Sequence, residues 1–224
     1  MRTRLKVCCI ASLAEARLAI SLGASALGLV AEMPSGPGPI PDARIAEIAA
    51  AVPPPIARFL LTSRTEPDDV VAHVRACGVD TVQLVAAVPD STYAALKQAL
   101  PHVRVVQVVH VEGPQTLAEA RRVAPHVHAL LLDSGRPGAA VPELGGTGRT
   151  HDWAVSARIV ATIDRPVFLA GGITPGNVGA ALRQSGPYGS DLCSGVRSDG
   201  RLDPIKLAAL VAGMEAAEAQ TLRH

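Results

Sequence analysis

The sequence predicts a single-domain α/β fold, a closed (β/α)8 or TIM barrel, and three observations indicate it. Short aliphatic runs alternate strictly with Ala-rich amphipathic segments of about ten residues, eight times along the chain. The aliphatic runs are apolar on both faces, which is typical of parallel strands covered by helices. The length of 224 residues fits a barrel of this kind, which usually needs about 200–250 residues.

The first half of the chain divides into four such units. Aliphatic and β-branched runs predict strands at residues 5–11, 26–31, 56–62 and 81–86. Ser12 is the expected N-cap of the first helix and Gly23 its stop, the Pro53-Pro54-Pro55 run ends the second, and Gly78 ends the third. These signals place helices at residues 13–22, 41–51, 67–77 and 90–100.

The second half repeats the pattern four more times. Strands are predicted at residues 103–109, 127–132, 166–170 and 190–193, from their aliphatic and β-branched content. Helices are predicted at residues 114–124, 151–163, 175–184 and 203–219, the first of them with Pro114 in its opening turn. The longest stretch without periodicity, residues 133–150, is too long for an ordinary connection and is a candidate functional loop.

An open doubly wound sheet is the competing architecture. Eight repeats in so short a chain favour the barrel, and the first strand lacks the Gly-x-Gly-x-x-Gly signal of a dinucleotide-binding sheet. No linker or change of composition divides the chain, so residues 1–224 are expected to form one domain.

Composition excludes several classes of partner. With 21 basic and 20 acidic residues and only five aromatic ones, the chain offers neither a basic face nor stacking platforms for nucleic acid. Its apolar runs are too short to span a membrane, and its first residues do not resemble a signal peptide, so a cytoplasmic location is expected. Four cysteines without a Cys-x-x-Cys pair do not predict a disulfide framework.

Active sites of (β/α)8 barrels lie at the carboxyl ends of the strands, and this rule selects three glycine-rich loops. They are Gly145-Gly146-Thr147-Gly148 after the sixth strand, Gly171-Gly172 after the seventh, and Ser194-Gly195 after the eighth. Glycines allow backbone N–H groups to approach an anion, and the last loops of such barrels commonly hold phosphate. The alternative is that these glycines only make turns.

The same rule selects Asp133 and Cys8 as candidates for acid–base chemistry. Asp133 ends an aliphatic run, so a buried carboxyl with a raised pKa could act as a general acid, or it could merely cap a turn. Cys8 ends the first strand, where a thiolate could act as base or nucleophile, or the thiol could simply fill the core. Because side chains alternate along a strand, Cys8 and Cys9 are expected to point in opposite directions.

Two other chemistries are disfavoured. None of the three lysines, Lys6, Lys97 and Lys206, ends a predicted strand, which argues against a Schiff-base mechanism. The seven histidines lack metal-ligand spacing, and His126 and His128 open a strand at the opposite end of the barrel. No metal site is predicted.

A set of motifs, each weak alone, follows in a specific order along the chain: Lys6-Val7-Cys8, Val82-Gln83-Leu84, Leu131-Leu132-Asp133-Ser134, Gly145-Gly146-Thr147-Gly148, Leu169-Ala170-Gly171-Gly172 and Asp191 with Ser194-Gly195-Val196. With this set the chain resembles, along nearly its whole length, the phosphoribosylanthranilate isomerase family of tryptophan biosynthesis.

The resemblance implies an isomerase that needs no metal or organic cofactor. Members of this family carry out an Amadori rearrangement of a phosphoribosyl amine to a 1-deoxyribulose-5-phosphate amine. It implies that Asp133 protonates the ring oxygen and that Cys8 removes the C2 proton. It further implies that the sugar-phosphate substrate is held at its phosphate by Gly146, Gly171, Gly172, Ser194 and Gly195, and near its ribose hydroxyls by Asp191.

Three departures concern the end of the site that would hold the aromatic acid. Cys9 and Ala11 replace a glycine and a threonine of the family pattern, and Val85 replaces a histidine. After the second strand, residues 34–39 contain no arginine to grip a carboxylate, a charged pair worth about 1.5–3 kcal/mol. Either Arg64 or Arg136 substitutes in binding the substrate, or the protein has diverged.

The departures leave three functions open. They are the native isomerase, a diverged isomerase acting on another phosphoribosyl amine or sugar phosphate, and a non-catalytic relative that binds phosphosugars. The Ala-rich helix faces predict no clear interface, so monomer and homodimer both remain open.

Overall fold

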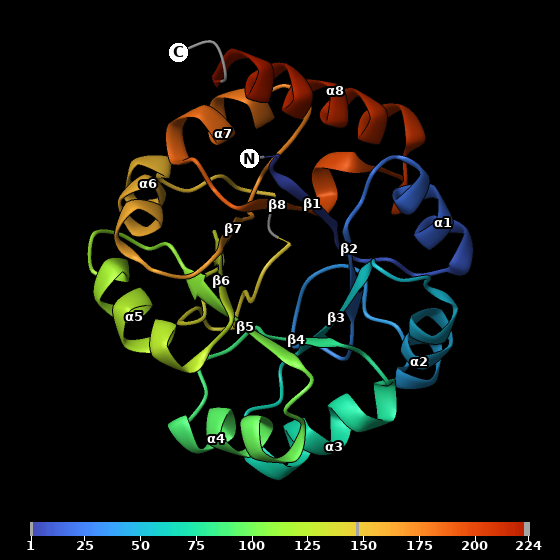
Figure 1. Cartoon of the computed structure of the whole chain (residues 1–224), viewed down its shortest axis with the longest axis vertical. Helices are drawn as coiled ribbons and strands as arrows, with labels where there is room; N and C mark the ends of the chain where they lie inside the picture. The colour runs from blue at the N-terminus through green and yellow to red at the C-terminus, as the bar shows by residue number, and fades with distance from the viewer. Residues whose placement is uncertain (1, 147, 222–224) are drawn as a thin grey trace.

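The computed structural model describes residues 2–146 and 148–221, so Thr147 of the predicted Gly-Gly-Thr-Gly loop lies outside the described residues. Eight parallel strands follow one another in chain order, and β8 pairs with β1 to close the barrel. Figure 1, viewed along the barrel, shows helices α1 to α8 in a ring around these strands. The predicted (β/α)8 barrel is therefore confirmed, and the open sheet is wrong.

The element bounds agree closely with the expected alternation. The barrel strands are β1 (Arg4–Val7), β2 (Ala26–Val30), β3 (Ala57–Thr62), β4 (Thr81–Leu84), β5 (Arg104–His110), β6 (Ala129–Asp133), β7 (Val167–Leu169) and β8 (Gly189–Leu192). The helices are α1 (Leu13–Ser21), α2 (Asp42–Ala51), α3 (Pro67–Cys77), α4 (Asp90–Ala99), α5 (Thr116–Val123), α6 (Trp153–Thr162), α7 (Val178–Ser185) and α8 (Pro204–Thr221).

Local chemistry explains where several elements begin and end. The Ser12 hydroxyl accepts the N–H of Glu15 and caps α1, and Gly78 adopts the left-handed conformation that ends α3. Strand β1 stops at Val7 instead of reaching residue 11, because Cys9 has a φ of 61° and turns the chain. Helix α7 begins three residues later than predicted, because the Asn177 side chain accepts the N–H of Thr174 in a preceding turn.

The prediction missed a short two-stranded sheet that follows β8. Strands β9 (Arg197–Ser198) and β10 (Arg201–Leu202) pair antiparallel around Asp199 and Gly200, which have φ values of 50° and 75°. Asp-Gly is a strong signal for such a turn, so this element was visible in the sequence. Short 3-10 helices η1 (Ala124–His126) and η2 (Ser194–Val196) were also not predicted.

Two apolar layers hold the barrel together, because neighbouring residues of a strand face opposite sides. Leu29, Leu60, Leu130 and Leu132 pack outward against the helices, while Val30, Leu61 and Leu131 pack inside the barrel. Phe59 and Phe168 meet edge to face in the interior, with ring centroids 6.0 Å apart. The interior is thus filled with side chains, which leaves the loops at the strand ends to form a site.

Helix α8, at 18 residues the longest described, carries Glu215 and Glu218. Within residues 2–146 and 148–221, every helix is too short or too polar to cross a membrane.

Candidate active site

A cavity lies at the carboxyl ends of the barrel strands. It is lined by eight of the ten residues selected from the sequence: Cys8, Asp133, Gly146, Gly171, Gly172, Asp191, Ser194 and Gly195. These residues come from four different strand ends, so only closure of the barrel brings them together.

Asp133 is the last residue of β6 and is only 7% exposed. One carboxylate oxygen accepts the backbone N–H of Ser134 at 2.7 Å. Burial raises the pKa of Asp133, although the Ser134 hydrogen bond and the charges of His110 and Lys6 oppose the rise. The side chain is therefore a carboxyl that keeps its proton to a higher pH than an ordinary aspartate.

Glycines make room for this carboxyl. A Cβ added at Gly145, which has a φ of 145°, would lie 2.7 Å from Asp133 Oδ2, and one at Gly171 would lie 3.1 Å from Oδ1. At distances this short, a side chain in place of either glycine would force the Asp133 carboxyl to move. These glycines therefore leave the space that the Asp133 carboxyl occupies, in addition to making turns.

Cys8 follows β1 and its backbone N–H donates to the carbonyl of Leu192 at 2.7 Å. A Cβ at Gly28 would lie 2.8 Å from the Cys8 sulfur, so that glycine is needed for the thiol to occupy its place. The expectation that Cys8 and Cys9 point in opposite directions is wrong, since both line the cavity. The left-handed backbone of Cys9 ends the alternation that the expectation assumed.

Asp191 forms an ion pair with Lys6 beneath the cavity, where the Lys6 side chain is fully buried. Lys6 Nζ lies 2.8 Å from Asp191 Oδ1, and the two side chains are 0% and 7% exposed. Burial alone would lower the pKa of Lys6, but the Asp191 carboxylate raises it above its usual value. Burial raises the pKa of Asp191, and the Lys6 cation at the cavity wall opposes that rise.

Lys6→Met is expected to lower the free energy of unfolding by about 3–5 kcal/mol, because it leaves a buried carboxylate without its cation. Urea unfolding followed by circular dichroism measures the change. Arg2→Met is the matched control: it breaks the exposed Arg2–Glu215 pair, and a loss below about 1 kcal/mol is expected. An equal, small loss in both variants would contradict the structural importance of the buried pair.

The glycine loops after β6, β7 and β8 meet at one side of the cavity. A Cβ at Gly172 would lie 2.6 Å from the Arg149 carbonyl carbon, and one at Gly148 would lie 3.5 Å from the Ser194 hydroxyl. A Cβ at Gly195 would collide with the Ile173 carbonyl oxygen. The three loops thus pack backbone against backbone, an arrangement that can present N–H groups to an anion.

Arg64 and Arg136 do not reach this cavity. Arg64 lies 3.5 Å from Asp42 Oδ2, and Arg136 Nε lies 2.9 Å from Glu143, and both arginines are exposed. Arg136 is held by backbone hydrogen bonds to Glu143, which turn its side chain to solvent. Among the described residues that line the cavity, none is basic.

Sequence reasoning did not select two further cavity residues, Gln83 and Cys193. Gln83, on β4, is only 3% exposed, and its Oε1 has no hydrogen-bond partner within the described part of the chain. Its amide is therefore available to a bound molecule. A signal existed for both: Gln83 is polar in the middle of an apolar strand, and Cys193 lies two residues after Asp191, on the same face.

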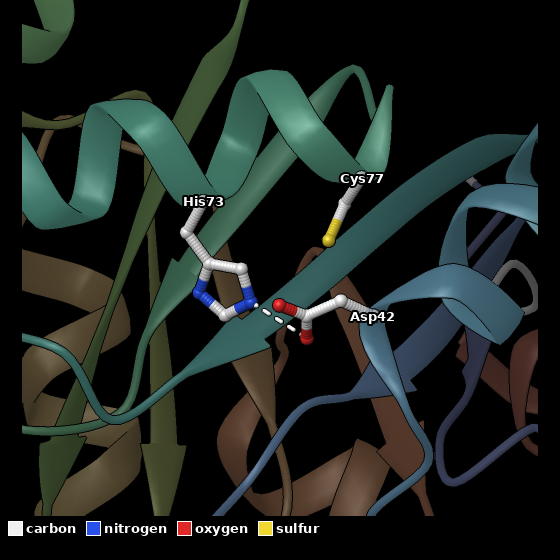
Figure 2. A group of neighbouring side chains, drawn as sticks. All are labelled: Asp42, His73 and Cys77. Atoms are coloured by element: carbon white, nitrogen blue, oxygen red, sulfur yellow. Dashed lines mark hydrogen bonds and ion pairs between the residues drawn. The ribbon is translucent and has the colours of Figure 1, made fainter.

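A second polar cluster lies outside the cavity, between α2 and α3. Figure 2 shows Asp42, His73 and Cys77, whose ligand atoms all lie within 4.8 Å of one another. These oxygen, nitrogen and sulfur donors are of the kinds that zinc accepts. They already take part in a protein network, since His73 bonds Asp42 at 3.1 Å and Thr62 at 3.0 Å, and Asp42 also pairs with Arg64.

This network is expected to make stability depend on pH. Burial lowers the pKa of His73 despite the Asp42 hydrogen bond, so the unfolded chain binds its proton first as the pH falls below about 6.5. The stability that neutral His73 contributes is fully present above that pH. It is lost as the pH falls further, down to the lowered pKa of His73 in the folded protein. At pH 8, the free energy of unfolding of His73→Asn should therefore be about 1–3 kcal/mol below that of the wild type. This difference between variant and wild type should become smaller at pH 5.

Urea unfolding at the two pH values measures this difference. His102→Asn, which replaces an exposed histidine, is the matched control and should show no change in the difference. If the difference in free energy of unfolding between wild type and His73→Asn stayed constant with pH, it would contradict the conclusion that His73 is buried in its neutral form.

Comparisons with known proteins agree with this geometry. Residues 5–213 match the family model for N-(5'-phosphoribosyl)anthranilate (PRA) isomerase. The chain is 37% identical to N-(5'-phosphoribosyl)anthranilate isomerase of Haloferax volcanii, covering 99% of this chain and 97% of the relative. It is 34% identical to isomerase 2 of Methanosarcina mazei, over 91% of this chain and 90% of that protein.

A solved structure shows the same architecture. The crystal structure of phosphoribosyl anthranilate isomerase from Thermus thermophilus superposes with a TM-score of 0.80 at 31% identity, and the alignment covers 96% of this chain and 99% of that one.

Proposed function

This chain belongs to the N-(5'-phosphoribosyl)anthranilate isomerase family, and we propose that its barrel, residues 1–224, isomerises phosphoribosylanthranilate with Asp133 as general acid and Cys8 as general base. One observation carries these roles. A buried carboxyl with a raised pKa and a thiol line the same cavity, from the ends of different strands, beside packed glycine loops.

In the first step, the protonated Asp133 carboxyl donates its proton to the furanose ring oxygen. The bond between that oxygen and C1 breaks, and the nitrogen lone pair forms a C=N bond, which leaves an open-chain Schiff base. Proton donation requires a protonated carboxyl, and burial, which raises the pKa of Asp133, favours that form.

In the second step, the Cys8 thiolate removes the proton from C2. The C–H electrons form a C1=C2 bond and neutralise the nitrogen, and the resulting enol rearranges to the 2-ketone as C1 gains a proton. Asp191, which Lys6 pairs at 2.8 Å, is suited to accept hydrogen bonds from the ribose hydroxyls while the sugar is held.

The phosphate is assigned to the glycine side of the cavity. Gly146, Gly171, Gly172 and Gly195 can present backbone N–H groups, and the Ser194 hydroxyl adds a donor. Because no described cavity residue is basic, the grip on this anion would come from backbone and hydroxyl donors, and the near-zero net charge of the chain is compatible with that.

Turnover of N-(5-phosphoribosyl)anthranilate by the purified protein tests the proposal. Formation of the 1-deoxyribulose-5-phosphate amine is expected, together with growth of a tryptophan auxotroph that lacks this isomerase. Binding of the substrate without turnover would overturn the catalytic roles of Asp133 and Cys8.

The described residues that line the cavity include no basic side chain, and this favours one alternative substrate, another phosphoribosyl amine without a carboxylate. Neither Arg64 nor Arg136 reaches the cavity, so an anthranilate carboxylate would meet at most the Gln83 amide. Comparing kcat/KM for the anthranilate and aniline derivatives separates the two: a higher value for aniline would favour the alternative.

A further inference from the structure

Two cysteine side chains that the proposed reaction does not use meet at the cavity wall. Cys9 follows β1 and Cys193 follows β8, and their sulfur atoms lie 2.6 Å apart. Both are free thiols, and both line the cavity, through which a small solute can reach them. Cys77, the free cysteine that does not line the cavity, is fully buried on α3.

The backbone on both sides of this contact is held in place. The Cys8 N–H donates to the Leu192 carbonyl at 2.7 Å, which ties the end of β1 to the end of β8. The Arg197 guanidinium donates to the carbonyls of both Cys8 and Cys9. Arg197 is itself paired with Glu15 at 2.9 Å, with both side chains largely buried. The approach of the two sulfurs is thus built into the strand ends.

Cys9 takes up its position against a local conformational preference. Its φ of 61° lies in the left-handed region, which costs a non-glycine residue of order 1 kcal/mol or more. A Cβ at Gly38 would lie 2.6 Å from Cys9 Cβ, so the loop after β2 also leaves space for this side chain. Strained residues that the surrounding structure holds firmly are often functional.

The two thiols differ in chemical character. The hydrogen bond between Cys9 and Cys193, in which either sulfur can be the donor, lowers the pKa of Cys193 against the effect of burial, and the nearby Arg197 charge adds to this. The same hydrogen bond raises the pKa of Cys9. Cys193 is therefore the more readily ionised and more nucleophilic thiol of the pair, and Cys9 is placed to react with a sulfenic acid that forms on it.

We propose that Cys9 and Cys193 are a modification site, at which a hydroperoxide converts the two thiols into a reversible disulfide. The Cys193 thiolate attacks one oxygen of hydrogen peroxide, the O–O bond breaks, and a sulfenic acid forms. The released hydroxide takes the Cys9 proton to give water. The Cys9 sulfur then attacks Cys193, the S–O bond breaks, and the second hydroxide leaves and is protonated. The thiols lose two electrons, and the peroxide becomes two waters.

The disulfide would bear on catalysis because Cys9 is joined directly to Cys8. Fixing Cys9 to Cys193 shifts the end of β1, and displacements of about 1 Å in an active site can cost up to a hundredfold in rate. We expect kcat/KM to fall about tenfold to a hundredfold on oxidation and to recover with dithiothreitol. This consequence rests on the proposed function, whereas formation of the disulfide does not.

The test is a mass measurement on the full-length protein. The reduced protein is treated with hydrogen peroxide, alkylated under denaturing conditions, digested with trypsin and analysed without reduction. We expect a cross-link between residues 7–17 and 184–197 that dithiothreitol removes. Because residues 7–17 contain both Cys8 and Cys9, variants assign the bond.

Cys8→Ala should keep the cross-link, whereas Cys9→Ser and Cys193→Ser should abolish it. Cys77→Ala, a cysteine variant away from the pair, should also keep it. Circular dichroism checks that each variant is folded. A cross-link that survives in Cys9→Ser, or wild-type protein oxidised to sulfinic acids without any cross-link, would overturn the proposal. If the cross-link formed and kcat/KM did not change, the predicted effect of the disulfide on catalysis would be overturned. The proposed isomerase activity would be unaffected by that result.

Discussion

Asp133→Asn is expected to lower kcat for phosphoribosylanthranilate by about 10²–10⁴-fold, the usual contribution of a general acid. The amide has the size and shape of the carboxyl but cannot deliver a proton to the ring oxygen. Its carbonyl can still accept the Ser134 N–H, so the local structure is expected to survive. Steady-state kinetics with the purified variant measures the loss, and KM should change much less than kcat.

The pH profile provides a second measurement for the same residue. As the proposed general acid, Asp133 acts in its protonated form, and burial raises its pKa, so activity should be present below that pKa and fall as the pH rises through it. The Asn variant should lose this alkaline decline from its residual activity. Asp164→Asn, an exposed aspartate after α6, is the control and should behave as wild type. A variant at position 133 that keeps more than about a tenth of kcat would rule out the assigned role.

Cys8→Ser is expected to produce a loss of similar size, about 10²–10⁴-fold in kcat, because a hydroxyl does not ionise near neutral pH. The serine preserves the shape of the site, including the close approach of Gly28 to the side chain. The loss should therefore arise in proton removal, while substrate binding remains. A spectroscopic titration of the inactive variant with substrate measures that binding directly.

Hydrogen exchange at C2 separates the base from the acid. In the wild type, deuterium at C2 of the substrate should be removed during turnover and slow it, whereas Cys8→Ser should retain the label in the recovered substrate. Cys77→Ala removes a cysteine outside the cavity and should leave both kcat and label loss unchanged. Loss of the C2 label at the wild-type rate in Cys8→Ser would assign the base to another group.

The hydrophobic pattern and the residues that begin and end helices were sufficient to predict the barrel. Strict alternation of aliphatic runs and amphipathic segments identified every barrel strand and every long helix, and signals such as Ser12 and Gly78 located their ends. Errors occurred where a side chain or backbone angle acts locally. The turn at Cys9 shortened β1, and the Asn177 side chain delayed α7.

Much of the candidate site could also be predicted, because a barrel places the ends of all its strands on one face. Eight of the ten selected residues line one cavity, since each lies near or after the carboxyl end of a strand. Arg64 and Arg136 fulfil the same positional rule, yet their side chains pair with Asp42 and Glu143 outside the cavity. Position along the chain does not say which of two neighbours a long side chain will bind.

The sequence by itself determined the barrel, the face that carries the candidate site, and the selection of Asp133 and Cys8 as candidates, because these follow from periodicity and from residue type at strand ends. Tertiary structure alone decided the pairings across the closure between β1 and β8. The buried Lys6–Asp191 ion pair and the Cys9–Cys193 contact each join residues more than 180 positions apart. Such contacts depend on register and on one backbone angle at Cys9, which a short-range sequence pattern does not encode.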